Sequence, residues 1–288
     1  MVAESAGRII AHRAFWPIDL HIGDDAVRGA QSIDLMVEAA YRGRGVFREL
    51  APASFAVAEQ RGLELLYGFP NRDAMRASAR LGWNHIGNVP RFVRPLRSDA
   101  FRRLPTSLRP FAALALRAWP QARCGGFAVT LQRPSDAELA SLLTHRSSST
   151  DAICETARSL SWYDWRFSPL GEVRYEWISV HAEGAPAAFA VWGHSHDGRN
   201  ARLAEVVGVS RTAISAAVAS VIGRARKAGC SSVEALTTRG DVVHALGVNG
   251  FRDNGPAAFR VKSLTRRKLS LADSFSQWRL LGCDFDVF

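Results

Sequence analysis

Residues 42–45, Arg-Gly-Arg-Gly, have the composition of a loop that could bind a phosphate group. They lie between a run that favours a strand and a run that favours a helix. Glycine allows a tight turn and a close approach of the backbone to a ligand, because it has no Cβ. The unbonded N–H groups of a helix's first turn, at the positive end of the helix dipole, suit a pyrophosphate. Glycine pairs also occur as plain structural turns, so the spacing alone leaves both interpretations open.

The residues around this loop predict an alternation of strands and helices. Segments 8–20 and 32–38 favour strands separated by turn residues at 23–25, and 63–69 favours a third strand. Helices are expected at about 46–61 and 72–81, each followed by a glycine suited to end it. Pro52 lies inside the first helix, where we expect a kink or irregular first turns, because proline removes a backbone hydrogen bond. This order predicts a crossover between neighbouring strands.

The second half of the chain repeats this order of elements with little residue identity. Apolar runs at 187–192 and 201–207 flank a turn, and a helix at 213–228 and a strand at 232–237 follow. We therefore predict an α/β (α+β) protein with two similar mixed-sheet domains in tandem. The predicted domains are residues 1–97 and 126–265, joined by a basic, proline-rich connector at 98–125 and followed by a C-terminal extension at 266–288.

The stretch from Asp34 to Trp83 resembles the GNAT N-acetyltransferase family. Val37 followed by residues 41–47, Tyr-Arg-Gly-Arg-Gly-Val-Phe, is similar to that family's acetyl-CoA loop, Gln/Arg-x-x-Gly-x-Gly/Ala. Residues 67–71, Tyr-Gly-Phe-Pro-Asn, and 81–83, Leu-Gly-Trp, are similar to its next strand and to its helix ending in Leu-Gly-Phe. The tandem GNAT type is the subgroup indicated, since Trp165-Arg166 resembles the motif that opens its second half.

The resemblance implies that the protein binds acetyl-CoA or a related acyl-CoA and transfers the acyl group to an amine. Backbone groups of the loop would hold the pyrophosphate, and strand residues would bond the pantetheine arm. The implied cofactor-binding residues are Met36, Val37, Arg42, Gly43, Arg44, Gly45, Val46, Phe47 and Asn71. Asn71 also suits the N-cap of the helix that follows it, and the two roles are compatible.

Departures from the family pattern affect the expected chemistry. Phe47 stands where the loop motif has its last glycine or alanine, which narrows the phosphate site. Ser78 stands where the family has its general-acid tyrosine, so Tyr67, water or the acceptor is expected to supply the proton. The first domain begins about where the family's second strand should be, so we expect its first strand and helices to be missing. The second domain lacks a glycine loop, and we expect a degenerate copy that does not bind CoA.

Asp34 completes the set of catalytic candidates, with Tyr67 and Ser78. It points to the strand face opposite Val37 and could act as the general base. The alternative is a strand aspartate that is only hydrated or salt-bridged. His194 and His196 share a strand face without a third ligand nearby, so we predict no metal site.

The net charge of +10 suits an anionic partner, whether nucleic acid, a membrane surface or a polyphosphate cofactor. Nine arginines and one acidic residue, Asp99, occur between Arg91 and Arg133. Nucleic acid is the weakest of these alternatives, because no base-reading or phosphate-tracking motif accompanies the charge. The connector, around residues 101–103 and 111–119, could lie on an anionic membrane surface or remain a solvated linker.

Other sequence features indicate the cytoplasm. No apolar run approaches the roughly 18 residues of a membrane-spanning helix, and the first residues do not form a secretory signal. The four cysteines are far apart in the sequence, which supports neither a disulfide framework nor a zinc site.

These observations predict an N-acyltransferase that moves an acetyl or other acyl group from acyl-CoA to an amine, with a sugar, small metabolite or envelope precursor as acceptor. A non-catalytic CoA-binding or scaffolding module is the alternative, because of Ser78 and the short front end of the first domain. The sequence does not specify an oligomeric state.

Overall fold

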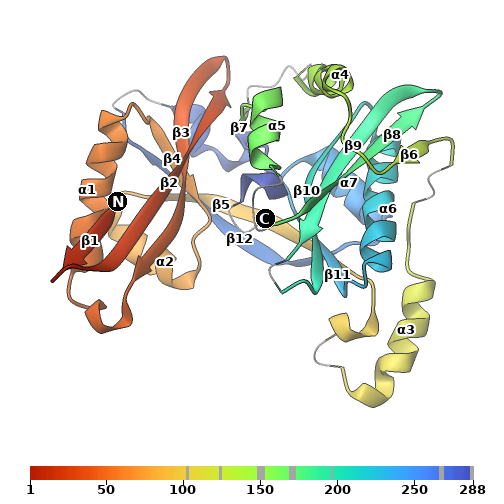
Figure 1. Ribbon diagram of the computed structural model, residues 1–288, viewed down its shortest axis with the longest axis horizontal. Helices are drawn as coiled ribbons and strands as arrows, with labels where there is room; N and C mark the ends of the chain where they lie inside the picture. The colour runs from red at the N-terminus through yellow and green to blue at the C-terminus, as the bar shows by residue number, and fades with distance from the viewer. Residues whose placement is uncertain are drawn as a thin grey trace. The chain divides into compact units, whose positions relative to one another are not determined.

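The structure is a computed structural model of the 288-residue chain, and it describes residues 1–101, 104–122, 125–147, 153–168, 173–195, 197–265 and 269–285. The fold is mixed α/β with a large mixed sheet (Figure 1). Contacts divide the chain into two compact units. Unit 1 comprises residues 1–89, 151–157 and 257–279, and unit 2 comprises 90–150, 158–256 and 280–288. This division is not sequential, unlike the domain boundaries that we predict, because residues after 256 return to unit 1 and then to unit 2.

The strands of unit 1 follow the order β1-β2-β3-β4-β12, and β7 pairs with the end of β2. Their bounds are β1 Val2–Ser5, β2 Arg8–Ile22, β3 Asp25–Val37, β4 Leu65–Gly68, β7 Cys154–Thr156 and β12 Arg252–Ser263, of which the part from residue 257 lies in unit 1. β2 and β3 form the predicted antiparallel hairpin, and β3 and β4 are parallel. All four residues of β4 are buried, as expected for an apolar strand between β3 and β12.

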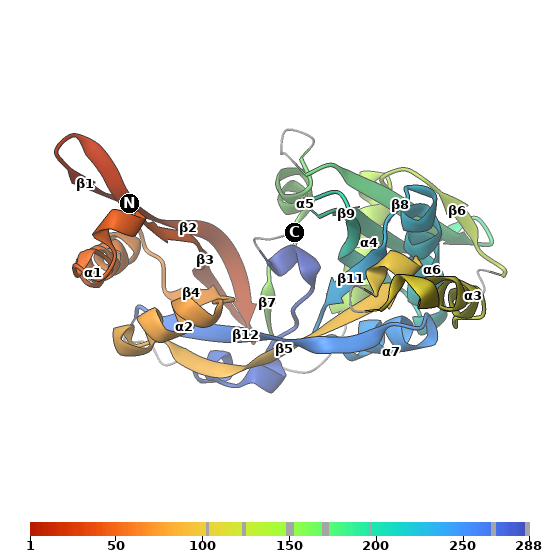
Figure 2. The same ribbon diagram turned by 90° about the horizontal axis from the view of Figure 1, so that it is seen from below.

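Two helices of unit 1 follow the predicted positions closely. They are α1, Val46–Gln60, and α2, Arg72–Ser78, which continues as a 3-10 turn over Ala79–Leu81. α1 lies beside β2 (Figure 1 and Figure 2). Ala58 of α1 joins a core with Ala30, Leu66 and Trp83. α1 is continuous through Pro52.

The strands of unit 2 follow the order β5-β11-β10-β9-β8-β6. Their bounds are β5 Asn84–Pro95, of which residues 90–95 lie in this unit, β6 Ala128–Thr130, β8 Tyr175–Ala182, β9 Ala185–His194, β10 Asn200–Gly208 and β11 Ser232–Leu236. The helices are α3 Arg109–Arg117, α4 Asp136–Ser147, α5 Leu160–Arg166, α6 Arg211–Lys227 and α7 Gly240–Val248. The β9–β10 hairpin, α6 and β11 confirm the elements predicted for this half, and β10 runs parallel to β11 as β3 does to β4.

Short 3-10 helices occupy Ala39–Tyr41, Ser98–Ala100, Thr106–Leu108, Ser270–Asp273, Phe275–Gln277 and Gly282–Asp284. The segment predicted as a C-terminal extension is thus ordered into turns from residue 270, and many of its side chains are buried. Across the described ranges, no helix has the length and apolar character needed to cross a membrane.

Candidate functional site

The candidate site of unit 1 begins where β3 separates from β4. The two strands pair only from Gly29 to Gln31 of β3, opposite Leu65 to Tyr67. β3 then continues to Val37, paired with β2 alone. The last residues of β3 therefore present a strand edge that has no neighbour among the described residues, and such an edge can hydrogen-bond an extended ligand.

A β-bulge deforms this free end of β3. The register against β2 shifts between His12 and Ala14, and Asp34 adopts a positive φ of 45°. Leu35 and Met36 are both exposed, so the strict alternation predicted for this strand does not hold at Asp34. A bulge inserts one extra residue and re-aims the side chains after it, which explains the difference.

The glycine loop connects this strand to α1. Gly43 and Gly45 have φ values of 76° and 86°, which glycine adopts at little cost and other residues rarely adopt. Arg42 Nε donates a hydrogen bond of 3.0 Å to the carbonyl oxygen of Val37, which fastens the loop to the strand. The Arg44 guanidinium lies 5.5 Å from the centre of the Tyr41 ring.

The first turn of α1 has unbonded backbone donors. Gly45 is the N-cap residue and offers no side chain to the turn. In the described part of the chain, the first N–H of the helix that is hydrogen-bonded is that of Glu49, which donates to the Gly45 oxygen at 3.2 Å. The N–H groups of Val46, Phe47 and Arg48 have no hydrogen-bond partner in the described part of the chain. Phe47 is only half-buried. This turn therefore has the donor arrangement that an anion requires.

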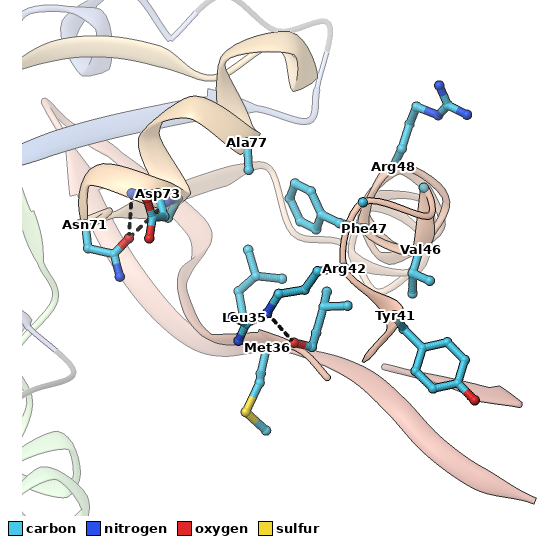
Figure 3. A pocket seen from close by; sticks show the side chains of 14 residues that line it. Leu35, Met36, Tyr41, Arg42, Val46, Phe47, Arg48, Asn71, Asp73 and Ala77 are labelled. Carbon is cyan, nitrogen blue, oxygen red and sulfur yellow. Dashed lines mark hydrogen bonds between the residues drawn. The ribbon is translucent and has the colours of Figure 1, made fainter. Parts of the chain in front are cut away.

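These elements enclose a cavity of about 630 Å³ (Figure 3). Its lining residues are Leu35, Met36, Val37, Tyr41, Arg42, Gly43, Gly45, Val46, Phe47, Arg48, Asn71, Asp73, Ala74 and Ala77. The structure thus brings eight of the nine predicted cofactor-binding residues to one cavity, and Arg44 is the exception. In Figure 3, Phe47 and Ala77 lie on the side of the cavity away from Leu35 and Met36.

Asn71 connects the cavity to α2. Its side-chain oxygen accepts hydrogen bonds from the N–H groups of Asp73, at 3.1 Å, and Ala74, at 2.9 Å. The predicted N-cap role is therefore confirmed. Because the oxygen is used in this way, a ligand contact by Asn71 would use its side-chain NH₂ group.

The three catalytic candidates are not among the residues that line the cavity. Tyr67 is 1% exposed, with its ring 5.9 Å from Trp278 and 6.0 Å from Phe69 between ring centres. The Ser78 hydroxyl donates to the Ala74 oxygen at 2.7 Å and accepts from Arg260 Nη1 at 2.6 Å. Asp34 is exposed on the bulge. None of these three candidates therefore lies in the cavity in the position of a general-acid tyrosine.

Arg13 is a buried charged residue near the loop that is not among the residues predicted from the sequence. It is 3% exposed, and its guanidinium lies 4.6 Å from the Phe55 ring and 6.0 Å from the Phe47 ring. One nitrogen donates to the Ser32 hydroxyl at 3.4 Å, and the described residues offer no partner to Nε and Nη1. Burial lowers the pKa of Arg13 to about 10, so the group stays charged at neutral pH. The sequence feature that could have identified Arg13 is its position on the inward face of a predicted strand, where an arginine is unusual.

Unit 2 contains a similar separation of parallel strands, at β10 and β11. Their pairing ends at Leu203, and β10 continues beside β9 to Gly208 with a register shift between Leu203 and Glu205. Here the chain's own residues 280–285 lie against the separated strands. Leu281 pairs with Thr237, just after β11, and a Cβ at Gly282 would overlap the backbone oxygen of Leu203.

Buried charges hold this C-terminal segment. Arg158 binds Asp284 at 2.8 Å and Glu205 at 2.8 Å, and all three side chains are at most 3% exposed. Burial opposes the charge of Arg158, but Asp284, Cys283 and Glu205 raise its pKa above the usual value. Arg166, from the Trp165-Arg166 motif, donates to the backbone oxygen of Cys283 at 2.9 Å.

The remaining polar candidates of unit 2 have ordinary partners. Ser210 caps α6 by accepting a hydrogen bond from the Ala213 N–H at 3.1 Å, so this helix start is partly satisfied. His194 Nδ1 lies 3.6 Å from the Cys230 sulfur. His196, like Arg102, Arg103, Arg123 and Cys124 of the connector, lies outside the described residues.

The chain is similar to known proteins in sequence over its first part and in fold over most of its length. Residues 1–86 match the family model of an acetyltransferase (GNAT) domain. No curated protein matches the chain at a significant level. Solved structures are similar in fold at low sequence identity. A GCN5-related N-acetyltransferase from Anabaena variabilis is 12% identical, with a TM-score of 0.61 over 92% of this chain and 62% of that one.

Two further structures extend the comparison. A GCN5-related N-acetyltransferase from Kribbella flavida is 17% identical, with a TM-score of 0.57 over 90% of this chain and 58% of that one. The N-myristoyltransferase of Saccharomyces cerevisiae, solved with bound myristoyl-CoA, is 13% identical, with a TM-score of 0.67 over 91% of this chain and 68% of that one. The chain therefore spans about 62% of the Anabaena protein. Residues 1–86 are thus similar in sequence to GNAT acetyltransferase domains, and the chain has the GNAT fold.

Proposed function

We propose that the protein is an acyl-CoA-dependent N-acyltransferase whose acyl-CoA site is the cavity of unit 1. One observation carries the proposal: the unbonded N–H groups of Val46, Phe47 and Arg48 and the free edge of β3 line the same cavity. A pyrophosphate needs the first feature, and an extended amide-containing chain such as pantetheine needs the second.

The lining residues have distinct roles in this proposal. Backbone N–H groups at 46–48 bind the pyrophosphate, and Arg42 and Arg48, which line the cavity, add positive charge around it. Arg44 adds charge from the same loop, outside the cavity lining. Met36 and Val37 hydrogen-bond the pantetheine arm through their backbone, and Asn71 contacts it through its side-chain NH₂ group. Arg13 adds a buried positive charge behind Phe47.

The reaction is a direct transfer. The acceptor nitrogen attacks the thioester carbonyl, a carbon–nitrogen bond forms, the carbon–sulfur bond breaks, and CoA leaves as a thiolate. Asp34 on the bulge is the proposed base that takes the proton from the amine. Water or the acceptor protonates the thiolate, because Tyr67 is buried and the Ser78 hydroxyl is bonded to Ala74 and Arg260.

The proposal also assigns roles to the two units, the acyl group and the acceptor. The two units are a tandem pair of GNAT-like copies, and unit 2 is the degenerate copy that does not bind CoA. The acyl group is acetyl or a longer acyl chain, and the acceptor is an amine on a sugar, small metabolite or envelope precursor. Cys154, Cys230 and Cys283 are free and buried, which favours the cytoplasm as the location.

A non-catalytic CoA-binding module is the second candidate, and the positions of Tyr67 and Ser78 favour it. Release of free thiol from acetyl-CoA over a panel of amines separates the two. Thiol release that depends on one amine supports the enzyme, and tight CoA binding without release on any amine supports the module.

Calorimetric titration of CoA into the wild-type chain and into Gly45→Val tests the site. The side chain would strain a backbone at φ 86° and fill the approach to the first turn of α1, so we expect Kd to rise by more than about tenfold. Gly126→Val is the matched control, because Gly126 has a φ of 83° and nothing within 4 Å of an added Cβ. Unchanged CoA affinity in a folded Gly45→Val protein would show that the loop is not the site.

A further inference from the structure

Helix α3 of unit 2 exposes large apolar side chains to solvent. Phe111 is 71% exposed, Leu114 is 63% exposed, and Leu108, in the turn just before the helix, is 46% exposed. The only buried residue of α3 is Leu116. Scattered apolar residues on a surface are normal, but a group of large ones on a single element indicates a contact surface.

The three exposed side chains share one face. Positions 108, 111 and 114 recur every third residue, which places them within an arc of about 120° around the helix axis. Leu116 lies on a different side of the helix and is buried. In Figure 1, α3 (yellow) stands clear of the strands and of α6 within its unit. The apolar face is therefore available to a partner.

The charge around this face selects the kind of partner. The described residues of 97–122 include three arginines, Arg97, Arg109 and Arg117, and one acidic residue, Asp99. Arg117 lies in the last turn of α3 and is exposed, and the Arg97 side chain is 58% exposed. A protein partner or a second copy needs only the apolar side chains. A nucleic acid needs only the arginines. An anionic bilayer surface uses both, because acyl chains accept the apolar residues and phosphate headgroups attract arginine.

We propose that α3 with its preceding turn, residues 106–117, is a membrane-surface element that binds anionic phospholipid. Leu108, Phe111 and Leu114 enter the boundary between headgroups and acyl chains, and Arg97, Arg109 and Arg117 contact lipid phosphates. The binding is peripheral and reversible, since a single short amphipathic helix buries little apolar area. This proposal does not depend on the acyl-CoA site.

Co-sedimentation of the full-length protein with vesicles tests it. Phosphatidylcholine vesicles are compared with vesicles that also contain phosphatidylglycerol, at low and high salt. We expect binding about tenfold stronger with phosphatidylglycerol and weakened by salt. The double substitution Phe111→Ser and Leu114→Ser should reduce that binding about tenfold, because it removes the inserted side chains.

The matched control is Val129→Ser with Leu131→Ser, which replaces two apolar residues of unit 2 that are 38% and 56% exposed elsewhere. It should bind vesicles as the wild type does. Equal binding to both kinds of vesicle, or full binding by the Phe111/Leu114 variant, would overturn the proposal. A third result would also overturn it: no vesicle binding, together with a concentration-dependent dimer in light scattering that the Phe111/Leu114 variant does not form. The partner of this face would then be a second copy of the chain.

Discussion

Units 1 and 2 use the same strand arrangement for different purposes. In each, two parallel strands pair for three or four residues and then separate, with a register shift in the strand that continues. In unit 1 the free edge of β3 lines a cavity. In unit 2 residues 280–285 lie against β10 and pair beyond the end of β11. An unpaired strand edge must find a partner, so it becomes a binding site when the chain supplies none.

The helices that follow the two strand edges also differ: one leaves its first turn open, and the other is packed into a core. The N-cap residue of α1 is Gly45, which offers the first turn no side chain, whereas the N-cap residue of α6 is Ser210, whose side chain caps the first turn. α1 buries four residues and α6 buries ten. The start of α1 is thus left open for a ligand, and α6 is built into a core. Substitutions should therefore affect ligand affinity in unit 1 and stability in unit 2.

The largest stability effect is expected from Glu205→Gln. The Glu205 carboxylate is fully buried and lies 2.8 Å from Arg158 and 3.8 Å from Arg239. Removing its charge breaks its buried ion pairs with both arginines, so that Arg158 keeps only Asp284 and Arg239 only Asp241 as carboxylate partners among the described residues. We therefore expect the free energy of unfolding to fall by about 3–5 kcal/mol. Denaturant unfolding measures the loss. Glu176→Gln is the control, because its partly exposed pair with Arg224 should contribute less than about 1 kcal/mol. Equal losses in the two variants would contradict the view of this cluster as core.

The loop of unit 1 was predictable because its signals are local. Gly43, Gly45 and the end of α1 follow from glycine conformation and helix periodicity over fewer than about twenty residues. The cap at Asn71 follows from its own side chain and the two N–H groups next to it. The resemblance to the GNAT family rested on these segments, and it is confirmed for residues 1–86.

The features missed depend on contacts between distant residues. Arg260 reaches Ser78 across 182 positions of sequence, and Trp278 packs on Tyr67 across a similar separation. Periodicity shows which face of a strand is apolar, but not which strand or segment will cover it. For the same reason the C-terminal segment was predicted as an extension, although Asp284 is 1% exposed beside Arg158.

A smaller loss is expected from Gly282→Ala, which tests the C-terminal segment directly. The new Cβ would overlap the backbone oxygen of Leu203, so the segment or β10 must shift. Such overpacking costs about 1–3 kcal/mol, measurable by denaturant unfolding. Gly240→Ala is the control, because nothing lies within 4 Å of its added Cβ at the start of α7. Similar stability of both variants would mean that the segment does not pack closely against β10.

Pro52→Ala should raise the stability of the protein, and by the smallest amount of these effects. It changes α1, which buries fewer residues than α6. Pro52 is exposed inside α1 and gives the Arg48 carbonyl no N–H partner one turn later. Alanine restores that hydrogen bond, so we expect unfolding to cost about 1–2 kcal/mol more, less than the full peptide value because the helix has adapted to the ring. Pro110→Ala in the first turn of α3 is the control and should bring no gain, because proline suits that position. If Pro52→Ala raised the thermal midpoint but also weakened CoA binding, the proline would be shaping the open first turn of α1. If the thermal midpoint did not rise, the stability of α1 would not be limited by the hydrogen bond that Pro52 removes.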